Sequence, residues 1–563
     1  MSLKVPKAGT PIFKDGYKIS QGIEDAVLRN IEAASELSGM LRTSFGPNGK
    51  NKIVINHLSR TFVTSDSATI LRELDVVHPI GKLLVLASQQ QEAELGDGSA
   101  LVVMLAGELL QKAAQLITLG LHPTEVLQGY ELARDKAVQE LEDLSVASLT
   151  SPPTVESLAL AIRPALASKQ YGQEDLLAPL VAQAVSLVLP QAPSGTGASS
   201  SSSAAFLKDF NVDNVRVVKI MGGSLSDSRV VRGMVFGRTP EGVVRKAEAA
   251  KVAVFTCGLD ISQTETKGTV LLHNAKELST FSHGEEKSLE LIIRQIADSG
   301  VKVVVTGSTV GELAMHYLNR FGILVIKILS KFELRRLSTL LGATPLARMG
   351  PPTPEEAGWV DVVETTEIGG DRVTVFRQEE GKVGGKAKPR MATVVLRGAT
   401  ANLLDDVERA VDDGVNVIKA LTRDARLVPG AGATEVELSR RVTEFGEKMP
   451  GLNQHAIRKF AEALEVVPRT LAENAGLDAT ETVSAVFAKH ANKDSADVGI
   501  DIDGENDGTV ATTPAQIFDV LAAKHWALRY ATGAAVQVLS VDSIIMSKPA
   551  GIKVPQQKGW DED

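Results

Sequence analysis

Apolar residues recur at helical spacing near the start of this 563-residue chain. One face of the segment 20–42 carries Ile23, Val27, Ile31, Ala34, Leu37 and Leu41. This period predicts an amphipathic helix. The turn-rich segment FGPNGKNK follows, and then two short β-like runs, KIVI and TFVT, joined by NHLSR. These runs predict a hairpin, after which the loop SDSAT leads into another helix.

The segment from Ser99 to about Leu119 is apolar on almost every side, as expected of a buried helix. The chain enters it through Gly96-Asp97-Gly98, a carboxylate between two glycines. No apolar run approaches the ~18 residues that a membrane span needs, because Glu108 interrupts the longest candidate. We expect the region up to about residue 149 to be mainly helical.

Between about residues 215 and 377 the pattern changes. Strand-like runs (KVAVFTC, VKVVVTG, ILVIKIL) alternate with helical runs (EEKSLELIIRQIADSG, VGELAMHYLNRFG, KFELRRLSTLLGA). This alternation predicts a compact α/β domain. The polar stretch RQEEGKVGGKAKPR predicts an exit loop, and helical spacing returns from about residue 410. The layout is nested, so the two outer parts could form one domain that is split in sequence.

Two segments have compositions that disfavour a packed core. SGTGASSSSS, residues 194–203, is of low complexity, and we expect a disordered loop there. KPAGIKVPQQKGWDED at the C-terminus also predicts disorder.

Composition narrows the function classes. The formal net charge of −9 argues against general binding to nucleic acid or to anionic membranes, since both require a basic surface. The single cysteine, Cys257, excludes a disulfide within the chain and fits a reducing compartment. The N-terminal residues lack the apolar segment of a signal peptide. We therefore expect a cytoplasmic protein.

Asp97 is the first candidate for chemistry. A helix N-terminus offers free amide groups and a partial positive charge, which attract phosphate, and flanking glycines allow close approach. A carboxylate would repel phosphate unless Mg²⁺ lay between them. The alternative is that Asp97 or Ser99 only caps the helix.

Further segments strengthen the phosphate hypothesis. Asp66 in TSDSAT precedes a helix, SFGPNG is another Gly/Pro-rich turn, Asp412 and Asp413 form an acidic cluster in ERAVDDGVNVIKAL, and the loop PGAGATE contains Gly430 and Gly432. Together these segments supply what ATP hydrolysis requires: backbone cradles, a metal-binding carboxylate and carboxylates that orient water.

Other nucleotide and metal motifs are missing from the sequence. GKVGGKA is one residue too short for a Walker A loop and lacks the final Ser or Thr, and no GxGxxG follows a strand of the α/β region. This disfavours a Rossmann-type oxidoreductase. No HExxH or CxxC motif occurs, and the nine histidines show no metal-ligand spacing.

Six blocks resemble the signatures of the group II chaperonins: FGPNGKNK, TSDSATILREL, GDGSA, ERAVDDGV, GAGATE and FAEALEVVPRTLAENAGLD. They occur in the order typical of that family and cover the chain from about residue 10 to 550. The segments GPNGKNKIVINHL, ILRELDVVHP and KIMGGSLSDSRVVRGMVF are most similar to a subunit of the eukaryotic cytosolic chaperonin, TRiC/CCT.

The resemblance implies a multidomain α and α/β fold. Its parts would be a mainly helical equatorial domain split in sequence (1–150 and 413–563), a small intermediate domain (151–216 and 378–412) and an α/β apical substrate-binding domain (217–377) with a helical protrusion at about 260–297. It also implies an ATP-dependent chaperone subunit that binds ATP or ADP with Mg²⁺. Hydrolysis of the ATP would drive lid closure. The expected partners are the other subunits of a hetero-oligomeric double ring and unfolded cytosolic clients such as actin and tubulin. Nucleic acid and membranes are not expected partners.

Site residues follow from the same resemblance. Asp97 matches the magnesium ligand, and Asp66 and Asp413 match the carboxylates that activate the attacking water. The nucleotide-binding positions would be Phe45, Gly46, Pro47, Gly98, Ser99, Ala100, Leu101, Ser168, Lys169, Gly430, Ala431, Gly432 and Asp519, where Lys169 senses the terminal phosphate and Asp519 holds the ribose.

The client-binding surface would lie on KFELRRLSTLLGA, with Phe332, Arg335 and Arg336 facing the substrate. The alternative is that Phe332, Leu334 and Leu337 pack on the sheet below. NAKELSTFSHGEEKSLELIIRQI would be the lid helix, and its stripe of Leu289, Ile292, Ile293 and Ile296 is more typical of a core.

This sequence departs from the family pattern at three places. GDGTT is replaced by GDGSA, NDGAT by SDSAT, and the glycine triplet by Gly-Ala-Gly. Ala100 therefore lacks a hydroxyl that could bond phosphate. A hydrogen bond to a charged group contributes about 1.5–3 kcal/mol, so we predict hydrolysis that persists but is slow. The alternative is a scaffold that holds nucleotide without turnover.

Overall fold

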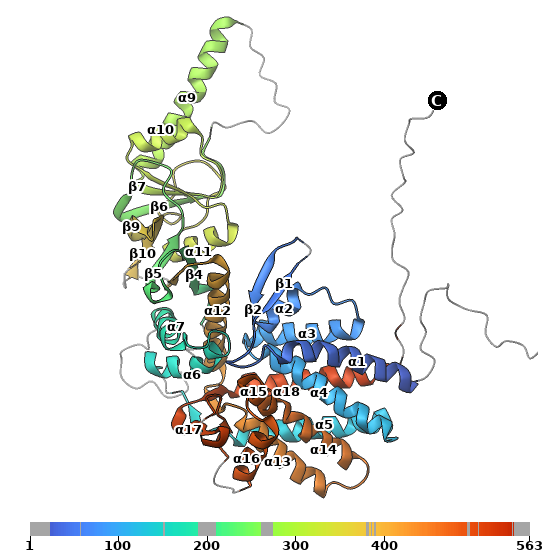
Figure 1. Ribbon diagram of the computed structural model, residues 1–563. Coiled ribbons are helices and arrows are strands. Elements are labelled where there is room, and N and C mark those ends of the chain that lie inside the picture. The colour runs from blue at the N-terminus through green and yellow to red at the C-terminus, as the bar shows by residue number, and fades with distance from the viewer. Residues whose placement is uncertain are drawn as a thin grey trace, which may run out of the picture.

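The computed structural model describes residues 23–544, apart from 57, 150–152, 190–209, 261–273, 379–381, 384–385, 388–389, 492–495, 505 and 543. The serine-rich segment 194–203, the C-terminal segment 548–563 and part of the expected protrusion lie outside the described residues. In Figure 1 the helices of the two chain ends lie together, and the large sheet stands beside them with α9 extending beyond it.

Helices from both chain ends share one hydrophobic core. The helices of this region are α1 (Ile23–Arg42), α3 (Pro79–Leu95), α4 (Ser99–Thr118), α5 (Pro123–Asp143), α13 (Ala433–Lys448), α14 (Asn453–Leu464), α15 (Val466–Ala475), α16 (Ala479–His490) and α18 (Leu521–Leu539). The residues Tyr130 and Phe460, more than 300 positions apart, pack edge to face with ring centroids 5.8 Å apart. The split helical region expected from the sequence therefore forms a single packed unit.

α4 lies at the centre of this core, against α1, α3, α14 and α18. Among the described helices it alone is long and apolar enough to cross a membrane, so the expectation that no run reaches this length is wrong. Most of its apolar surface is buried by neighbouring helices. Glu108 is tolerated there because Arg42 bonds it at 2.7 Å.

The predicted hairpin is confirmed. β1 (Lys52–Ile55) and β2 (Thr61–Thr64) are antiparallel, with Lys52 opposite Thr64. The helix expected after SDSAT is α2 (Ser67–Glu73).

An eight-stranded mixed sheet forms the centre of the second region, in the order β4-β13-β5-β10-β9-β6-β7-β8. Its strands are β4 (Val215–Met221), β5 (Arg229–Phe236), β6 (Lys246–Phe255), β7 (Val301–Thr306), β8 (Leu324–Lys327), β9 (Gly358–Ile368), β10 (Asp371–Arg377) and β13 (Ala392–Gly398). β6, β7 and β8 run parallel, as strand-helix alternation predicts. β9 and β10 pair antiparallel with their neighbours.

Alternation along the strands sends side chains to opposite faces of the sheet. Val252 and Val254 pack with α11 (Lys331–Leu341) on one face. Ala253 and Phe255 pack with α9 (Ala275–Asp298) and α10 (Glu312–Arg320) on the other. The expected lid helix thus buries Leu289, Ile293 and Ile296 and half-buries Ile292, which confirms the core interpretation of that stripe.

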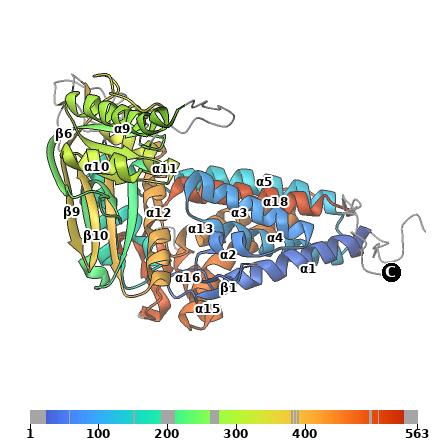
Figure 2. The same ribbon diagram turned by 90° about the horizontal axis from the view of Figure 1, so that it is seen from above.

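Another core joins the sheet to the helical region. α6 (Val155–Ala167), α7 (Glu174–Val188) and α12 (Ala401–Arg423) pack with β4 and β13. Figure 2 shows α12 between the sheet and the long helices. The helical pattern was expected from about residue 410, but α12 begins at Ala401, where Thr400 caps it, and continues unbroken past residue 412.

Short elements complete the described chain. They are β3 (Ala147–Ser148), η1 (Val212–Asn214), η2 (Leu225–Asp227), β11 (Lys382–Val383), β12 (Lys386–Ala387), β14 (Arg426–Pro429), β15 (Val498–Ile500), η3 (Asn506–Gly508), β16 (Thr509–Ala511), α17 (Thr512–Ala515) and β17 (Phe518–Val520). β11 and β12 pair within the stretch that was expected to be only an exit loop.

Candidate functional site

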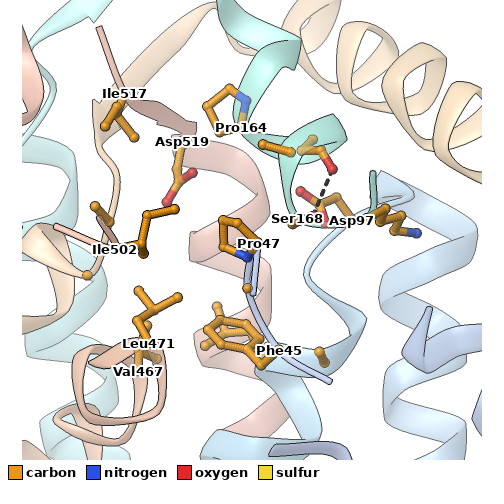
Figure 3. A pocket seen from close by; sticks show the side chains of 18 of the residues that line it. Phe45, Pro47, Asp97, Pro164, Ser168, Val467, Leu471, Ile502, Ile517 and Asp519 are labelled. Atoms are coloured by element: carbon orange, nitrogen blue, oxygen red, sulfur yellow. Dashed lines mark hydrogen bonds between the residues drawn. The ribbon is translucent and has the colours of Figure 1, made fainter. Parts of the chain in front are cut away.

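A cavity of about 550 Å³ opens where the helical region meets α6. Its walls come from both chain ends, from the end of α6 and from the segment that follows α6. They include parts of residues 44–47, 65–67, 97–101, 163–174, 431–435, 467–471 and 500–524. Figure 3 shows Asp519, Ile502 and Ile517 on one side and Asp97 and Ser168 on the other, with Phe45 and Pro47 between them. The volume is in the ordinary range for a cofactor site.

The loop with Phe45 and Pro47 is held by a side chain from the other chain end. Asn474 donates from Nδ2 to the carbonyl of Arg42 at 3.0 Å and to that of Phe45 at 2.7 Å. Gly46 has φ +80°, and a Cβ there would lie 2.6 Å from Leu471. The left-handed backbone conformation therefore favours a glycine at this position, and a Cβ there would force the Leu471 side chain to move.

Asp97 lies in the turn between α3 and α4. Gly98 is the N-cap of α4 and provides no side chain, while the Asp97 Oδ1 atom accepts from the Gly98 amide at 2.7 Å. The alternative that Asp97 caps α4 is therefore wrong. Gln91 supports the turn by donating from Nε2 to the Asp97 carbonyl at 2.9 Å and to the Ala523 carbonyl at 3.1 Å.

The Asp97 carboxylate suits a cation. Burial raises its pKa, and the nearby Lys169 and the Gly98 amide only partly oppose that rise. A divalent cation at this carboxylate would favour the ionised form. The described residues contain no group of three or more His, Cys, Asp or Glu side chains arranged for a metal. One protein carboxylate suits Mg²⁺, which takes its other ligands from water and phosphate.

Asp66 caps α2 and contacts Lys169. Its Oδ2 atom accepts from the amide of Thr69 at 3.0 Å and from the Thr69 hydroxyl at 2.7 Å, and its Oδ1 atom accepts from Lys169 Nζ at 3.0 Å. Burial raises the pKa, but the Lys169 charge and the Thr69 hydrogen bonds outweigh it and lower the pKa of Asp66 to about 2. Asp66 is therefore ionised at neutral pH.

Lys169 also contacts Asp413 through Oδ2 of that carboxylate. Asp413 lies on α12 and does not itself line the cavity. The neighbouring Asp406 ties this helix to both sides, because it accepts from Thr64 Oγ1 of β2 at 2.7 Å and from Gln170 Nε2 at 2.5 Å. Three separate segments thus meet around one ammonium group.

The start of α4 contributes Ser99, Ala100 and Leu101 to the cavity wall. The hydroxyl of Ser99 is hydrogen-bonded to that of Ser67 at 2.7 Å, and both side chains are buried. Ser67 stands where the family pattern has glycine. The serine at this position therefore forms a hydrogen bond with the Ser99 hydroxyl at the N-terminus of α4.

The opposite end of the cavity contains a second lysine between two acids. Lys524 Nζ bonds Asp519 Oδ2 at 2.8 Å and also contacts Glu435 Oε1. Burial lowers the pKa of Lys524, but the two carboxylates outweigh that effect and raise it. Sequence reasoning missed Glu435 and Lys524, although Glu435 is visible in GAGATE directly after the glycines.

Most residues predicted for catalysis, nucleotide binding or metal binding line this cavity: Phe45, Gly46, Pro47, Asp66, Asp97, Gly98, Ser99, Ala100, Leu101, Ser168, Lys169, Ala431, Gly432 and Asp519. Gly430 does not line it, and its amide instead bonds the Ile517 carbonyl at 3.0 Å beside the wall. The apolar lining residues Val467, Leu471, Ile502 and Ile517 were not predicted, because no local motif marks them.

The three residues predicted for client binding lie elsewhere, on α11. Phe332 is 80% exposed, whereas Leu334 and Leu337 are buried against the sheet, so the packing alternative holds for the two leucines only. Arg335 is exposed. Arg336 bonds Asp213 at 2.7 Å.

Residues 37–549 match the TCP-1/cpn60 chaperonin family, and the chain belongs to this family. The multidomain fold class and the chaperonin resemblance are thereby confirmed. The chain is 56% identical to the probable T-complex protein 1 subunit theta of Schizosaccharomyces pombe and 50% identical to the T-complex protein 1 subunit theta of Saccharomyces cerevisiae. It is 47% identical to the human protein of the same name, and in all three cases the match covers 100% of both chains. Proteins of this family are chaperones that generally bind ATP with Mg²⁺.

Proposed function

We propose that this chain is an ATP-hydrolysing subunit of a hetero-oligomeric double-ring chaperonin in the cytoplasm. One observation carries the proposal: Asp66 and Asp97 line one end of a single cavity, and Lys169 in the same wall contacts both Asp66 and Asp413, so acids from three separate segments meet at this end. The relatives named as T-complex subunits support the assembly.

Some cavity residues contact the phosphates of the nucleotide, and others contact its base and ribose. Gly98 and the amide groups at the start of α4 receive the phosphates, since a helix N-terminus favours anions. Asp97 would hold Mg²⁺, which would offset the phosphate charge. Phe45 and Ile502 cover the base, and Asp519 accepts from the ribose.

Asp66 and Asp413 orient the attacking water. Asp66 is ionised at neutral pH because its pKa is about 2, so it can accept a hydrogen bond from water. Lys169 pairs with both carboxylates in this structure. When its ammonium turns toward a terminal phosphate, the two acids are released to bind water. This exchange links occupancy of the cavity to the positions of α6 and α12.

We assign the nested regions accordingly. The helical region of both chain ends (1–150 and 413–563) is the nucleotide-binding equatorial part, and residues 217–377 are the client-binding apical part with its protrusion. The segments between them, 151–216 and 378–412, form the intermediate part. Lys169 follows α6 and Asp413 lies on α12, so closure of these segments completes the site.

A subunit-resolved ATPase measurement tests the proposal. The intact complex is compared with a complex in which this chain alone carries Asp66→Ala, and phosphate release per ring is counted under single turnover. We expect phosphate release per ring to fall by the contribution of one subunit, while the variant subunit still binds nucleotide. An unchanged count would favour the scaffold alternative, which the substitutions at Ser67 and Ala100 support. A native mass near that of one chain would refute the ring itself.

Client binding is proposed for the exposed face of α11. Phe332 offers an 80% exposed aromatic surface, and the exposed Arg335 beside it adds charge. Phe332→Ser should weaken retention of unfolded clients, such as actin or tubulin, and leave the ATPase rate unchanged. Leu313→Ser on α10 is the control, since Leu313 is also an exposed apolar residue. Equal losses from both variants would contradict a specific role for α11.

A further inference from the structure

The buried amide of Gln91 lies behind the turn that carries Asp97. Gln91 is on α3, is 0% exposed, and donates from Nε2 to the Asp97 carbonyl at 2.9 Å and to the Ala523 carbonyl at 3.1 Å. Gly98 permits this approach, because a Cβ there would lie 3.0 Å from the Nε2 atom. One side chain of α3 therefore joins the turn before α4 to the first turn of α18.

The chemistry of these contacts fixes which way the Gln91 amide group points. Both neighbours are carbonyl oxygens, which only accept hydrogen bonds, so the NH₂ group must face them. The Oε1 atom is buried without a hydrogen-bond partner among the described residues. An unpaired buried oxygen is costly, and an apolar side chain of the same size would avoid that cost. The two donated bonds are what an apolar side chain could not supply.

A chain of hydrogen bonds leads from Gln91 to the Asp97 carboxylate. Gln91 bonds the carbonyl of the peptide that links Asp97 to Gly98, and in a trans peptide the N–H points away from the C=O. This N–H, which belongs to Gly98, donates to the Asp97 Oδ1 atom at 2.7 Å. The orientation of one peptide plane thus sets the position of one carboxylate oxygen, and successive hydrogen bonds polarise one another.

We infer that Gln91 is a positioning residue for Asp97 and that its two donated bonds set the affinity of this subunit for Mg²⁺. The inference rests on the proposed nucleotide site, in which Asp97 would hold the metal. Gln91 does not line the cavity, so it acts only by holding the Asp97 turn against α18. Removal of a group that orients a metal ligand from behind lowers metal affinity by about 10–100-fold.

Photolabelling of the intact complex with 8-azido-ATP tests the inference, because denaturing electrophoresis then separates this chain from its partners. Labelling of this chain is measured at a series of free Mg²⁺ concentrations and in EDTA, so the readout is occupancy and not turnover. Gln91→Met keeps the length of the side chain and removes both donors. We expect it to raise the Mg²⁺ concentration for half-maximal labelling, the Mg²⁺ midpoint, about tenfold or more.

Labelling in EDTA should equal that of wild type, since the inference concerns the metal ligand alone. A wild-type Mg²⁺ midpoint in Gln91→Met would overturn the inference. Equal losses of labelling with and without Mg²⁺ would overturn it as well, because they would show that Gln91 supports the whole cavity.

Gln378→Met is the matched control. Gln378 is also a buried glutamine that donates to a carbonyl, that of Trp359 at 3.4 Å, and its Oε1 atom likewise has no partner among the described residues. It does not line the cavity and follows β10 of the sheet. The control therefore has a similar cost in stability, and its Mg²⁺ midpoint should equal that of wild type. An equal shift in both variants would assign the effect to lost stability.

Ser88→Ala is the local control. Ser88 lies on the same buried face of α3 and donates to the Ser99 carbonyl of α4 at 3.1 Å. It supports α4 but not the peptide that follows Asp97, so the Mg²⁺ midpoint should again equal that of wild type. An equal shift would show that packing of α3 against α4 sets the affinity, and the role of Gln91 would be wrong.

Gln91→Asn keeps the test decisive if Gln91→Met does not enter the complex. The amide of asparagine is one methylene shorter, so the donors remain but are drawn away from the two carbonyls. The Mg²⁺ midpoint should rise, by less than in Gln91→Met. A midpoint equal to that of wild type would contradict the positioning role.

Failure of the inference and failure of the proposed function are distinguishable. If labelling of the wild-type chain does not depend on Mg²⁺, the proposed role of Asp97 is wrong. If it depends on Mg²⁺ but the midpoints of the Gln91 variants equal that of wild type, only the positioning role of Gln91 is wrong.

Discussion

The two ends of the cavity use the same chemical unit in different structural settings. At one end Lys169 contacts Asp66 and Asp413, and at the other Lys524 contacts Asp519 and Glu435. Each lysine offsets two carboxylates that would otherwise be costly to bury.

The settings differ in which elements are joined. Lys524, Asp519 and Glu435 all come from the C-terminal part of the chain, although Phe518 and Val520 beside Asp519 pack in the core of α6 and α12. Lys169 follows α6, Asp66 caps α2, and Asp413 lies on α12. Since α6 and α12 pack in a separate core with β4 and β13, the Lys169 cluster spans two packed units. We infer that the Lys524 end fixes the nucleotide and the Lys169 end responds to it.

The largest expected effect is at the Lys169 end. Asp413→Asn keeps the shape of the side chain but removes the charge that orients water, a contribution of about 10²–10⁴-fold in rate. Single-turnover hydrolysis at this subunit should fall at least about 100-fold, whereas the affinity for ATP should stay within a few-fold. Hydrolysis at the wild-type rate would show that Asp413 has no catalytic role and that the two ends of the cavity do not differ in function.

Lys169→Met should change stability in a pH-dependent way. In wild type the pKa of Asp66 is lowered from 3.8 to about 2, which corresponds to about 2 kcal/mol of stability. That stability is present above the unfolded pKa of 3.8 and is lost as the pH falls through about 2. Without Lys169, burial is less opposed and raises the pKa of Asp66.

The sign of the pH effect follows from that rise. An acid whose folded pKa is raised destabilises the protein at neutral pH and less so as the pH falls. Thermal unfolding of the complex should therefore show the largest deficit for Lys169→Met at pH 7–8 and a smaller one toward pH 5. Lys112→Met is the control, because Lys112 is also paired with acids but lies away from the cavity. A deficit that grows as the pH falls would contradict the assignment.

Asp519→Asn should affect binding alone. Replacement of a charged acceptor costs about 1.5–3 kcal/mol, so the affinity for ATP should fall about tenfold or more at this subunit. The single-turnover rate at saturating ATP should stay close to wild type, since Asp519 is at the end away from Asp66. A large loss in rate at saturation would show that the two ends are not separate in function.

Ser67→Gly should have the smallest effect. The substitution removes the bond between the hydroxyls of Ser67 and Ser99 and frees Ser99 at the phosphate end. A neutral hydrogen bond contributes about 0.5–1.5 kcal/mol, so we expect hydrolysis to rise a few-fold. Ser67→Thr keeps the hydroxyl and serves as the control. A slower rate in Ser67→Gly would mean that the Ser67 bond positions Ser99 for phosphate.

Local sequence motifs alone predicted a large part of the fold and of the site. The hairpin, the helix after SDSAT, the buried α4 and the strand-helix alternation each depend on residues within a few positions of one another. The same holds for the glycine-flanked Asp97 and for Asp66 before its helix. Such features are set by backbone conformation and hydrophobic period, which a contiguous sequence displays directly.

The tertiary structure alone decided the pairings across the cavity. Lys169 and Asp66 are 103 positions apart, and Lys524 and Glu435 are 89 apart, so no local pattern joins them. Burial decides that these charges must be paired, and burial exists only once distant helices have packed. The same reason explains why the apolar lining residues and the engaged hydroxyl of Ser99 were not predicted. The sequence thus identified acids suited to the chemistry, while packing determined which lysine holds each one.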